Sequence, residues 1–115
     1  MDDRPEALLP AALWIDLALQ PLACRGIYHY IRQKGDAKTG VILLKLNGLA
    51  GFSRLLIQQR DENGILQWMQ ALKALDVPEA EAEGYIARAA LRDPDLWVIE
   101  IEDPAMANPF DGRSP

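Results

Sequence analysis

The stretch Asp93–Asp103 reads Asp-Pro-Asp-Leu-Trp-Val-Ile-Glu-Ile-Glu-Asp and predicts the strand around which the sheet forms. β-Branched and aromatic residues are dense in it, and it begins just after a proline, which favours a strand over a helix. Because side chains alternate along a strand, Glu100 and Glu102 share one face near its end. The opposite face is apolar throughout and consists of Trp97, Ile99 and Ile101. We therefore expect a strand in mid-sheet whose C-terminal end reaches solvent.

Two upstream segments strengthen the signal of this stretch and carry a resemblance to a known family. They read YIARAALR over residues 85–92 and RQKGDAKTGVILLKLNGL over residues 32–49. Together the three segments resemble an alphaproteobacterial family known as domain of unknown function 1491. In that family an acidic-Pro-acidic-Leu-Trp segment closes the domain, and a Gly-Asp step precedes a glycine and an apolar strand near the middle. The resemblance covers Trp14–Asp103, departs at Arg54–Leu75, and implies a shared fold and a bacterial cytoplasmic setting but no activity.

Length, charge and cysteine usage exclude several classes of protein. A chain of 115 residues and 12.8 kDa suits one domain with one core. A net charge of −5 and a pI near 4.7 argue against a phosphate-binding surface, and so against nucleic acid as a partner. The single cysteine, Cys24, allows no internal disulfide and fits a reducing compartment.

The apolar-rich segment Leu8–Ala23 does not fit an export signal, because the chain starts with acidic residues and Asp16 interrupts the apolar run. No run approaches the roughly 20 apolar residues of a membrane helix. We therefore expect a cytoplasmic protein with no membrane contact.

The segment 11–20 is ambiguous between strand and helix. Leu13, Ile15, Leu17 and Leu19 alternate with other residues as in a strand, whereas the alanines and leucines favour a helix. The family resemblance favours the strand. A helix is then expected to begin at Pro21 and to stop at Gly35, because apolar residues recur at helical spacing between them. That apolar stripe consists of Ala23, Ile27, Tyr30 and Ile31.

The middle of the chain predicts three strands and a second helix. Strands are expected at 38–47, 52–59 and 65–69, with Asn47-Gly48 as the turn of the first hairpin. A helix is expected from Asp76 to Arg92, with Asp76 as its cap and Ala82, Ile86 and Ala89 as its apolar stripe.

These elements predict an α+β domain over residues 11–103, in the order strand-helix-strand-strand-strand-helix-strand. Its sheet is mixed and mostly antiparallel, and both helices pack on one face. Residues 1–10 form an N-terminal extension, and residues 104–115 form a Pro-rich tail.

Glu100 and Glu102 form the one candidate metal site. Two residues apart on a strand, they point the same way with Cα atoms roughly 6.5 to 7 Å apart, and two such carboxylates can share Mg²⁺ or Mn²⁺. The metal would then activate water for hydrolysis. The alternative is that they form a solvated strand end or pair with Lys45 or Arg54 across the sheet.

Other chemistry-bearing residues point to binding rather than catalysis. Arg25, Tyr28 and Arg32 form a basic and aromatic patch on the expected first helix, a candidate site for a protein partner. His29 lies on the same helix without a catalytic neighbour, and Cys24 is expected to be buried and structural. Trp14, Trp68 and Trp97 fit either a core or a ligand pocket, and the core is favoured.

The sequence thus predicts no cofactor and no established activity, and it favours a module that binds another protein or a second copy of itself. Binding would use an exposed sheet edge or the first helix. The alternative is a divalent-metal-dependent hydrolase that uses Glu100 and Glu102, with Mg²⁺ or Mn²⁺ as its cofactor.

Overall fold

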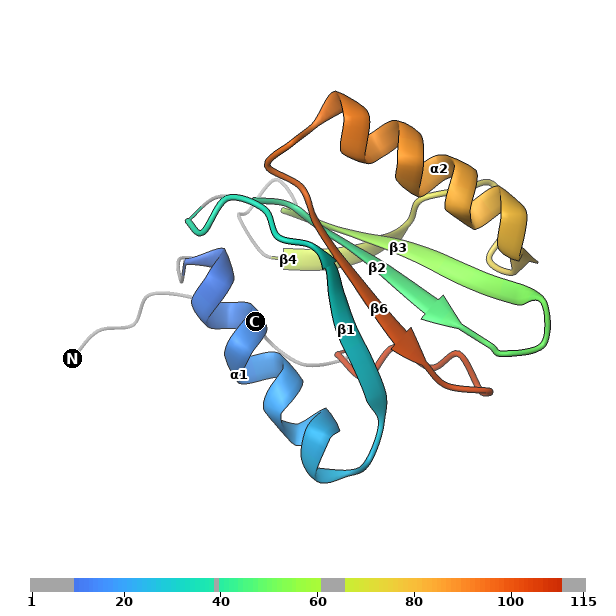
Figure 1. The fold of residues 1–115 in the computed structure, drawn as a ribbon, viewed down its shortest axis with the longest axis horizontal. Coiled ribbons are helices and arrows are strands. Elements are labelled where there is room, and N and C mark those ends of the chain that lie inside the picture. Colours follow the sequence, from blue (N-terminus) through green and yellow to red (C-terminus); the bar gives the residue numbers. More distant parts are fainter. Residues whose placement is uncertain (1–9, 39, 61–65, 111–115) are drawn as a thin grey trace.

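The structure, a computed structural model, describes residues 10–38, 40–60 and 66–110. It contains two helices and a six-stranded sheet (Figure 1). In chain order the elements are α1 (Ala11–Cys24), β1 (Tyr28–Gln33), β2 (Ile42–Asn47), β3 (Phe52–Arg60), β4 (Leu66–Gln70), β5 (Val77–Pro78), α2 (Glu79–Arg92) and β6 (Trp97–Glu102). The expected extension over 1–9, the turn at 61–64, Ile65 and the end of the tail at 111–115 lie outside the described residues.

The sheet confirms the α+β class and the mixed, mostly antiparallel pairing. Its strands follow the order β1-β6-β2-β3-β4, and the short β5 pairs with β3. β6 lies in mid-sheet as expected; its neighbours are β1, to which it is antiparallel, and β2, to which it is parallel. The hairpin at Asn47-Gly48 is also confirmed, because β2 and β3 pair antiparallel on either side of it. Neither helix within the described ranges is long and apolar enough to span a bilayer.

The N-terminal third of the chain differs from the prediction. The segment expected to be a strand is helix α1, and the segment expected to be a helix contains strand β1. The helix ends at Cys24 rather than at Gly35, and Gly26, whose φ of +73° suits glycine, turns the chain just after it. The N–H of Ile27 donates to the Leu22 carbonyl at 3.0 Å and the N–H of Gly26 to the Ala23 carbonyl at 3.2 Å, the two bonds of a Schellman motif.

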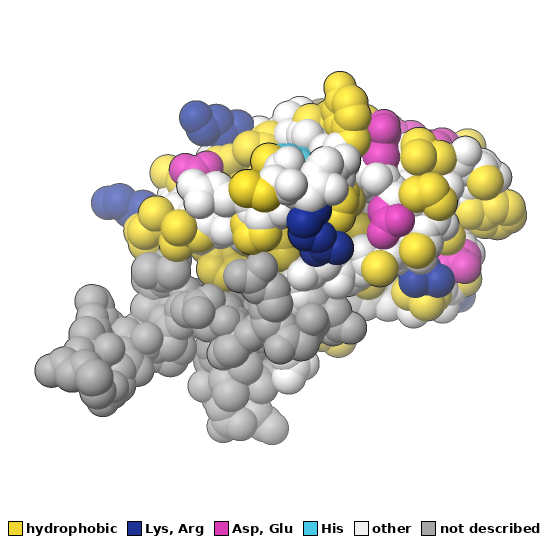
Figure 2. Space-filling view, turned by 90° about the horizontal axis from the view of Figure 1, so that it is seen from below, with side chains coloured by type: hydrophobic (Ala, Val, Ile, Leu, Met, Phe, Trp, Pro, Cys, Tyr) yellow, Lys and Arg dark blue, Asp and Glu magenta, His cyan; other side chains and the backbone are white. Residues whose placement is uncertain are grey.

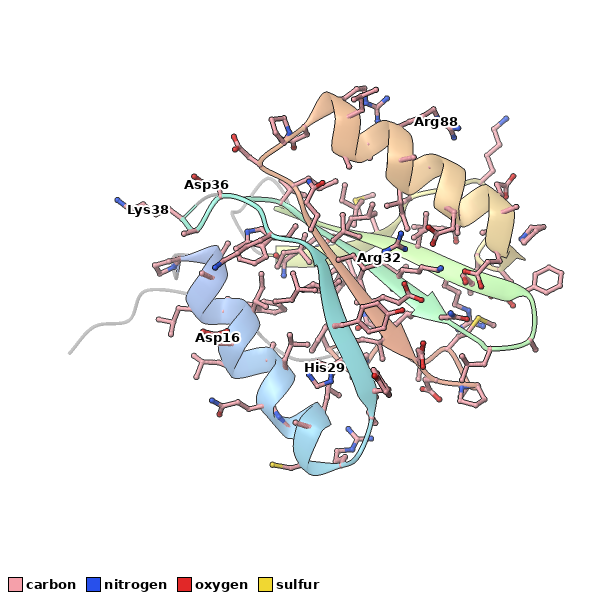
Figure 3. The ribbon with its side chains drawn as sticks, viewed as in Figure 1. Asp16, His29, Arg32, Asp36, Lys38 and Arg88 are labelled. Carbon is pink, nitrogen blue, oxygen red and sulfur yellow. The ribbon has the colours of Figure 1, made fainter. Side chains whose placement is uncertain are left out.

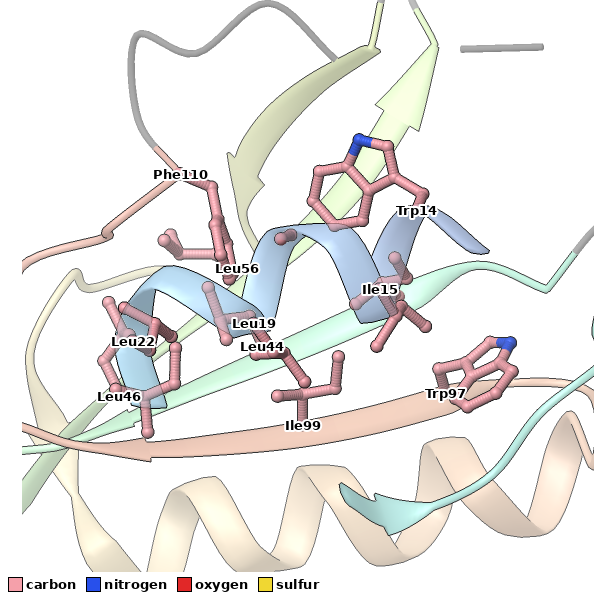
Figure 4. Close-up of a cluster of buried hydrophobic side chains, with 13 residues drawn as sticks. Trp14, Ile15, Leu19, Leu22, Leu44, Leu46, Leu56, Trp97, Ile99 and Phe110 are labelled. Carbon is pink, nitrogen blue, oxygen red and sulfur yellow. The ribbon is translucent and has the colours of Figure 1, made fainter. Parts of the chain in front are cut away.

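The two helices cover opposite faces of the sheet, so the expectation that both pack on one face is wrong (Figure 1). β2 and β6 are buried on both faces along most of their length, and a sheet of that kind needs a cover on each side. Figure 4 shows the buried apolar side chains between α1 and the sheet, with α2 on the far side of the sheet. We call this set of side chains the α1 core. The buried residues of α1 are Trp14, Ile15, Ala18, Leu19 and Leu22, and those of α2 are Ala82, Ile86 and Ala89, the stripe expected from the sequence.

The C-terminal segment contributes to the α1 core. Phe110 is 2% exposed, and its ring lies 5.5 Å from that of Trp14 and 5.9 Å from that of Trp68, centroid to centroid. Within the expected tail, Met106 and Phe110 therefore pack on the domain. Three aromatic rings at these distances gain from edge and stacked contacts in addition to their buried area.

Asp76 does not cap α2. The helix begins after Pro78 with no side-chain cap, and Asp76 instead accepts a hydrogen bond from Nε of Arg54 at 2.5 Å. Glu79 and Glu81 lie in the first turn of the helix, where the helix dipole favours negative charge.

Candidate interaction surface

β1 forms one edge of the sheet and is exposed along most of its length. It pairs with β6 on its inner side, and within the described part of the chain no strand pairs with its outer side. Tyr28 is 68% exposed, Tyr30 40% and Ile31 42%. An edge strand of this kind leaves alternate backbone N–H and C=O groups free for another strand.

Arg32, near the end of β1, points towards α2 from the same face of the strand as Tyr28 and Tyr30. The pairing with β6 shifts between Ile31 and Gln33, so Arg32 is the extra residue. The bulge brings Gln33 to the α2 side as well, because Gln33 pairs with Val98. Figure 3 shows Arg32 extending from β1 towards α2. Its Nη1 and Nη2 donate to the two carboxylate oxygens of Glu83 at 2.6 and 2.7 Å, and Nη1 also donates to Glu100 at 3.2 Å.

Lys45 and Glu100 are the buried members of a cluster of charged side chains beneath α2. Lys45 is 2% and Glu100 4% exposed, with Nζ 3.5 Å from the nearer Glu100 oxygen. Lys45 also donates to Glu79 and, at 2.5 Å, to Glu83. Burial lowers the pKa of Lys45, but the hydrogen bonds to Glu79 and Glu83 and the charge of Glu100 outweigh it, so the net pKa is raised. We name Arg32, Lys45, Glu79, Glu83 and Glu100 the charge cluster.

Glu100 is placed differently from the solvated strand end that the sequence suggests as an alternative, whereas Glu102, the last residue of β6, is half-buried. Glu100 is buried, and it accepts hydrogen bonds from Arg32 and, at 2.9 Å, from the amide of Asn47. The expected pairing with Lys45 is present, whereas Arg54 pairs with Asp76. Among the residues that the structure describes, no three His, Cys, Asp or Glu side chains gather as metal ligands. The oxygens of Glu100 therefore already face cations and donors of the protein.

The predicted patch of Arg25, Tyr28 and Arg32 is not on a helix. Tyr28 and Arg32 both belong to β1, and Arg25 follows the last residue of α1. Tyr28 and Tyr30 face the α2 side of the sheet, because they lie opposite Glu102 and Glu100, and their rings meet edge to face at 6.1 Å. Burial raises the pKa of the Tyr30 phenol and the charge of Glu100 raises it further, so this side chain keeps its hydroxyl proton.

The remaining residues considered for function are the histidine, the cysteine and the three tryptophans. His29 lies on β1, and its Nδ1 is 2.9 Å from the Ile27 carbonyl oxygen. Cys24 is exposed, which corrects the expectation of a buried thiol. The three tryptophans pack in or against the α1 core, as favoured from the sequence.

A groove of about 240 Å³ opens on the α2 side of the sheet beside β1. Arg32 and Gln33 form its β1 wall, and Val98 of β6 forms its floor. The α2 wall consists of Glu83, Ile86, Ala87 and Ala90. The groove could not be predicted from the sequence, because it depends on how α2 packs on the sheet and on the bulge at Arg32.

On the other side of the molecule, Figure 2 shows apolar side chains interspersed with charged ones. Leu13 and Leu17, one helical turn apart on α1, are 45% and 50% exposed. This surface offers a partner fewer free backbone N–H and C=O groups than β1 does, because the backbone groups of a helix bond to one another.

Because of the ion pairs of Glu83, we expect the stability of the protein to fall as the solution becomes acidic. Its pKa is lowered from 4.5 to about 2, chiefly by the hydrogen bond from Arg32. The native carboxyl thus binds its proton more weakly than the unfolded one, so the pairs stabilise the native state above about pH 4.5 and this contribution is lost as the pH falls towards 2. Because the side chain is 38% exposed, solvent screening limits the effect to about 1 kcal/mol.

Urea unfolding of the wild type and of Glu83→Gln at neutral pH and near pH 2 measures this contribution. The difference between the two proteins should be present at neutral pH and vanish in acid. Glu81→Gln, at an exposed position of the same helix, is the control. A difference of equal size at both pH values would contradict the prediction.

The two motifs that carried the family resemblance meet at one junction. The indole Nε1 of Trp97 donates to the carbonyl of Asp36 at 2.8 Å, and the N–H of Asp36 donates to the carbonyl of Asp95 at 3.0 Å. A Cβ on Gly35 or Gly40 would overlap the Asp95 carbonyl and the Trp97 ring. The Gly-Asp step and the acidic-Pro-acidic-Leu-Trp segment are therefore two halves of one packed contact.

Comparison with known proteins shows which family the chain is similar to. The chain matches the family described as "Protein of unknown function (DUF1491)" over residues 9–111. No curated protein matches it. The crystal structure of a DUF1491 family protein from Caulobacter crescentus CB15 is similar, with 30% identity, a TM-score of 0.76 and coverage of 90% of this chain and 94% of that one.

Two solution structures are also similar. The NMR structure of a DUF1491 family protein from Caulobacter crescentus CB15 has 31% identity and a TM-score of 0.75, over 89% of this chain and 92% of that one. Protein Atu0922 from Agrobacterium tumefaciens, at 20% identity, shows the same fold with a TM-score of 0.68 over 83% of this chain and 86% of that one. The family match and the shared fold confirm the resemblance, and this chain belongs to the DUF1491 family.

Proposed function

We propose that this protein binds another protein by accepting one of its segments as an additional β-strand along β1. The exposed outer side of β1 is the observation that carries the proposal. Main-chain hydrogen bonds to an edge strand provide affinity without a deep pocket. Tyr28, Tyr30 and Arg32 belong to the residue types that dominate binding energy at protein interfaces.

The charge of the segment 25–34, which includes β1, favours a partner other than a second copy. Residues 25–34 contain Arg25, Arg32 and Lys34 and no acidic residue, in a chain whose net charge is −5. Two copies of this strand side by side would bring like charges together, which destabilises cross-strand pairs. An acidic segment of another protein meets opposite charge instead, which raises both the rate and the specificity of association.

Selection from a library of random peptides tests the proposal, with hydrogen exchange as the readout. Selected peptides should slow exchange of the β1 amides, because strand addition engages them. The peptides should bind the Tyr28→Ala/Tyr30→Ala variant about tenfold or more weakly than the wild type. They should bind the control variant Leu17→Ala, which changes α1, as tightly as the wild type. Protection confined to other elements, or a selection that yields no binder, would contradict strand addition at β1.

Light scattering separates the second copy from another partner. We expect the mass of a monomer for the wild type. A dimer that becomes a monomer in the Tyr28→Ala/Tyr30→Ala variant would show that β1 serves self-association and would overturn the assignment of another protein.

A further inference from the structure

The groove beside β1 lies where a strand added to β1 would place half of its side chains. Successive residues of a strand alternate between its two faces, and residues two apart lie roughly 6.5 to 7 Å apart on the same face. One of those faces points to the α2 side of the sheet, where Arg32 and Gln33 border the groove. A strand paired with β1 can therefore reach the groove with a side chain while its backbone stays in the ladder.

We infer that the groove receives an apolar side chain of the added strand and that Arg32 receives a carboxylate two residues away from it. This inference rests on the proposed function and specifies the partner as an extended segment in which an acidic and an apolar residue are separated by one residue. The same-face spacing of a strand imposes that separation.

The lining of the groove explains why we expect an apolar side chain of the added strand to enter it. Val98 and Ile86 are buried apolar residues, 1% and 5% exposed, at its floor and inner wall. The outer wall consists of Ala87 and Ala90, whose short side chains leave the space open. Burying an apolar side chain there removes its surface from water, which favours binding.

The hydrogen bonds of Arg32 explain why we expect it to bind a carboxylate of the added strand. Among the described residues, three hydrogen bonds occupy its guanidinium, all from Nη1 and Nη2, and a guanidinium has further N–H donors. Its side chain is 28% exposed and therefore accessible. Glu83 does not attract a basic residue of the partner equally, because both its oxygens already accept from Arg32 and one also accepts from Lys45.

Fluorescence anisotropy with designed peptides tests the inference. The probe is a labelled nine-residue peptide of threonines with leucine at its centre and glutamate two residues to either side. We expect it to bind about tenfold more tightly than the same peptide with glycine at the centre, and about tenfold more tightly than the peptide with lysine in place of glutamate.

Two variants of the protein locate the contacts. Ala87→Trp fills the groove from an exposed position of α2 and should remove the preference for leucine over glycine. The matched control Ala80→Trp lies two turns earlier on the same helix, outside the groove lining, and should keep it. Arg32→Gln should remove the preference for glutamate over lysine while the preference for leucine remains.

Hydrogen exchange of β1 separates this inference from the proposed function. If the peptides protect the β1 amides but leucine and glycine bind alike, strand addition stands and the groove assignment is overturned. If leucine is preferred but Ala87→Trp leaves that preference unchanged, the side chain enters another site and the assignment is equally overturned. If no peptide protects β1, the proposed function fails and this inference fails with it.

Discussion

Lys45→Met is expected to lower the free energy of unfolding by about 3–5 kcal/mol. Lys45 is 2% exposed, and its ammonium faces three carboxylates, those of Glu79, Glu83 and Glu100. Removing the ammonium leaves Glu100, 4% exposed, with Arg32 as its remaining cation in the charge cluster. A buried carboxylate with too little compensating charge is costly because water can no longer solvate it.

Urea unfolding at neutral pH measures this loss. The double variant Lys45→Met/Glu100→Leu should be more stable than Lys45→Met alone, because it removes the stranded charge together with its partner. Lys73→Met, at an exposed position, is the control and should change stability by no more than about 0.5 kcal/mol. If the double variant is less stable than the single one, the charge cluster stabilises the fold in some other way.

Phe110→Ala is expected to cost about 3–5 kcal/mol, as for other buried phenylalanines. The ring is 2% exposed and contacts Trp14 of α1 and Trp68 of β4, so its loss opens a cavity between elements that are far apart in sequence. The tryptophans report the change directly, because their fluorescence depends on their surroundings.

Denaturant unfolding followed by tryptophan fluorescence measures the effect of Phe110→Ala. Leu91→Ala is the matched control, since Leu91 is 88% exposed and its truncation removes no buried contact. Equal stability of Phe110→Ala and the wild type would show that the segment after β6 is dispensable for the fold, as expected for a tail.

The N-terminal third of the chain shows why apolar periodicity alone does not distinguish a strand from a helix. The alternation of leucines over 13–19 fits a strand, but the same segment also places apolar residues one turn apart, and α1 buries that second pattern. Leu13 and Leu17, which supported the strand, are the exposed ones. Gly26 was the available signal for the helix end, and the aromatic and β-branched run after it was the signal for β1.

The candidate surface could be predicted only in part. Composition indicates Arg25, Tyr28 and Arg32 as a patch, and the structure places Tyr28 and Arg32 on one exposed strand rather than on a helix. Glu100 was singled out as acidic, but its burial and its contacts with Arg32, Lys45 and Asn47 depend on three strands meeting. Sequence spacing does not record such cross-strand neighbours when the strand order is unknown.

The sequence by itself determined the elements whose signals are local. These are the Asn47-Gly48 hairpin, the apolar stripe of α2 and the apolar faces of β2 and β6, because turn chemistry and side-chain periodicity act within a few residues. Only the tertiary structure decided which sheet face each helix covers, that Phe110 completes the core, and that β1 is the exposed edge beside a groove. Those outcomes depend on contacts between distant segments, where the burial of several apolar faces at once outweighs local preference.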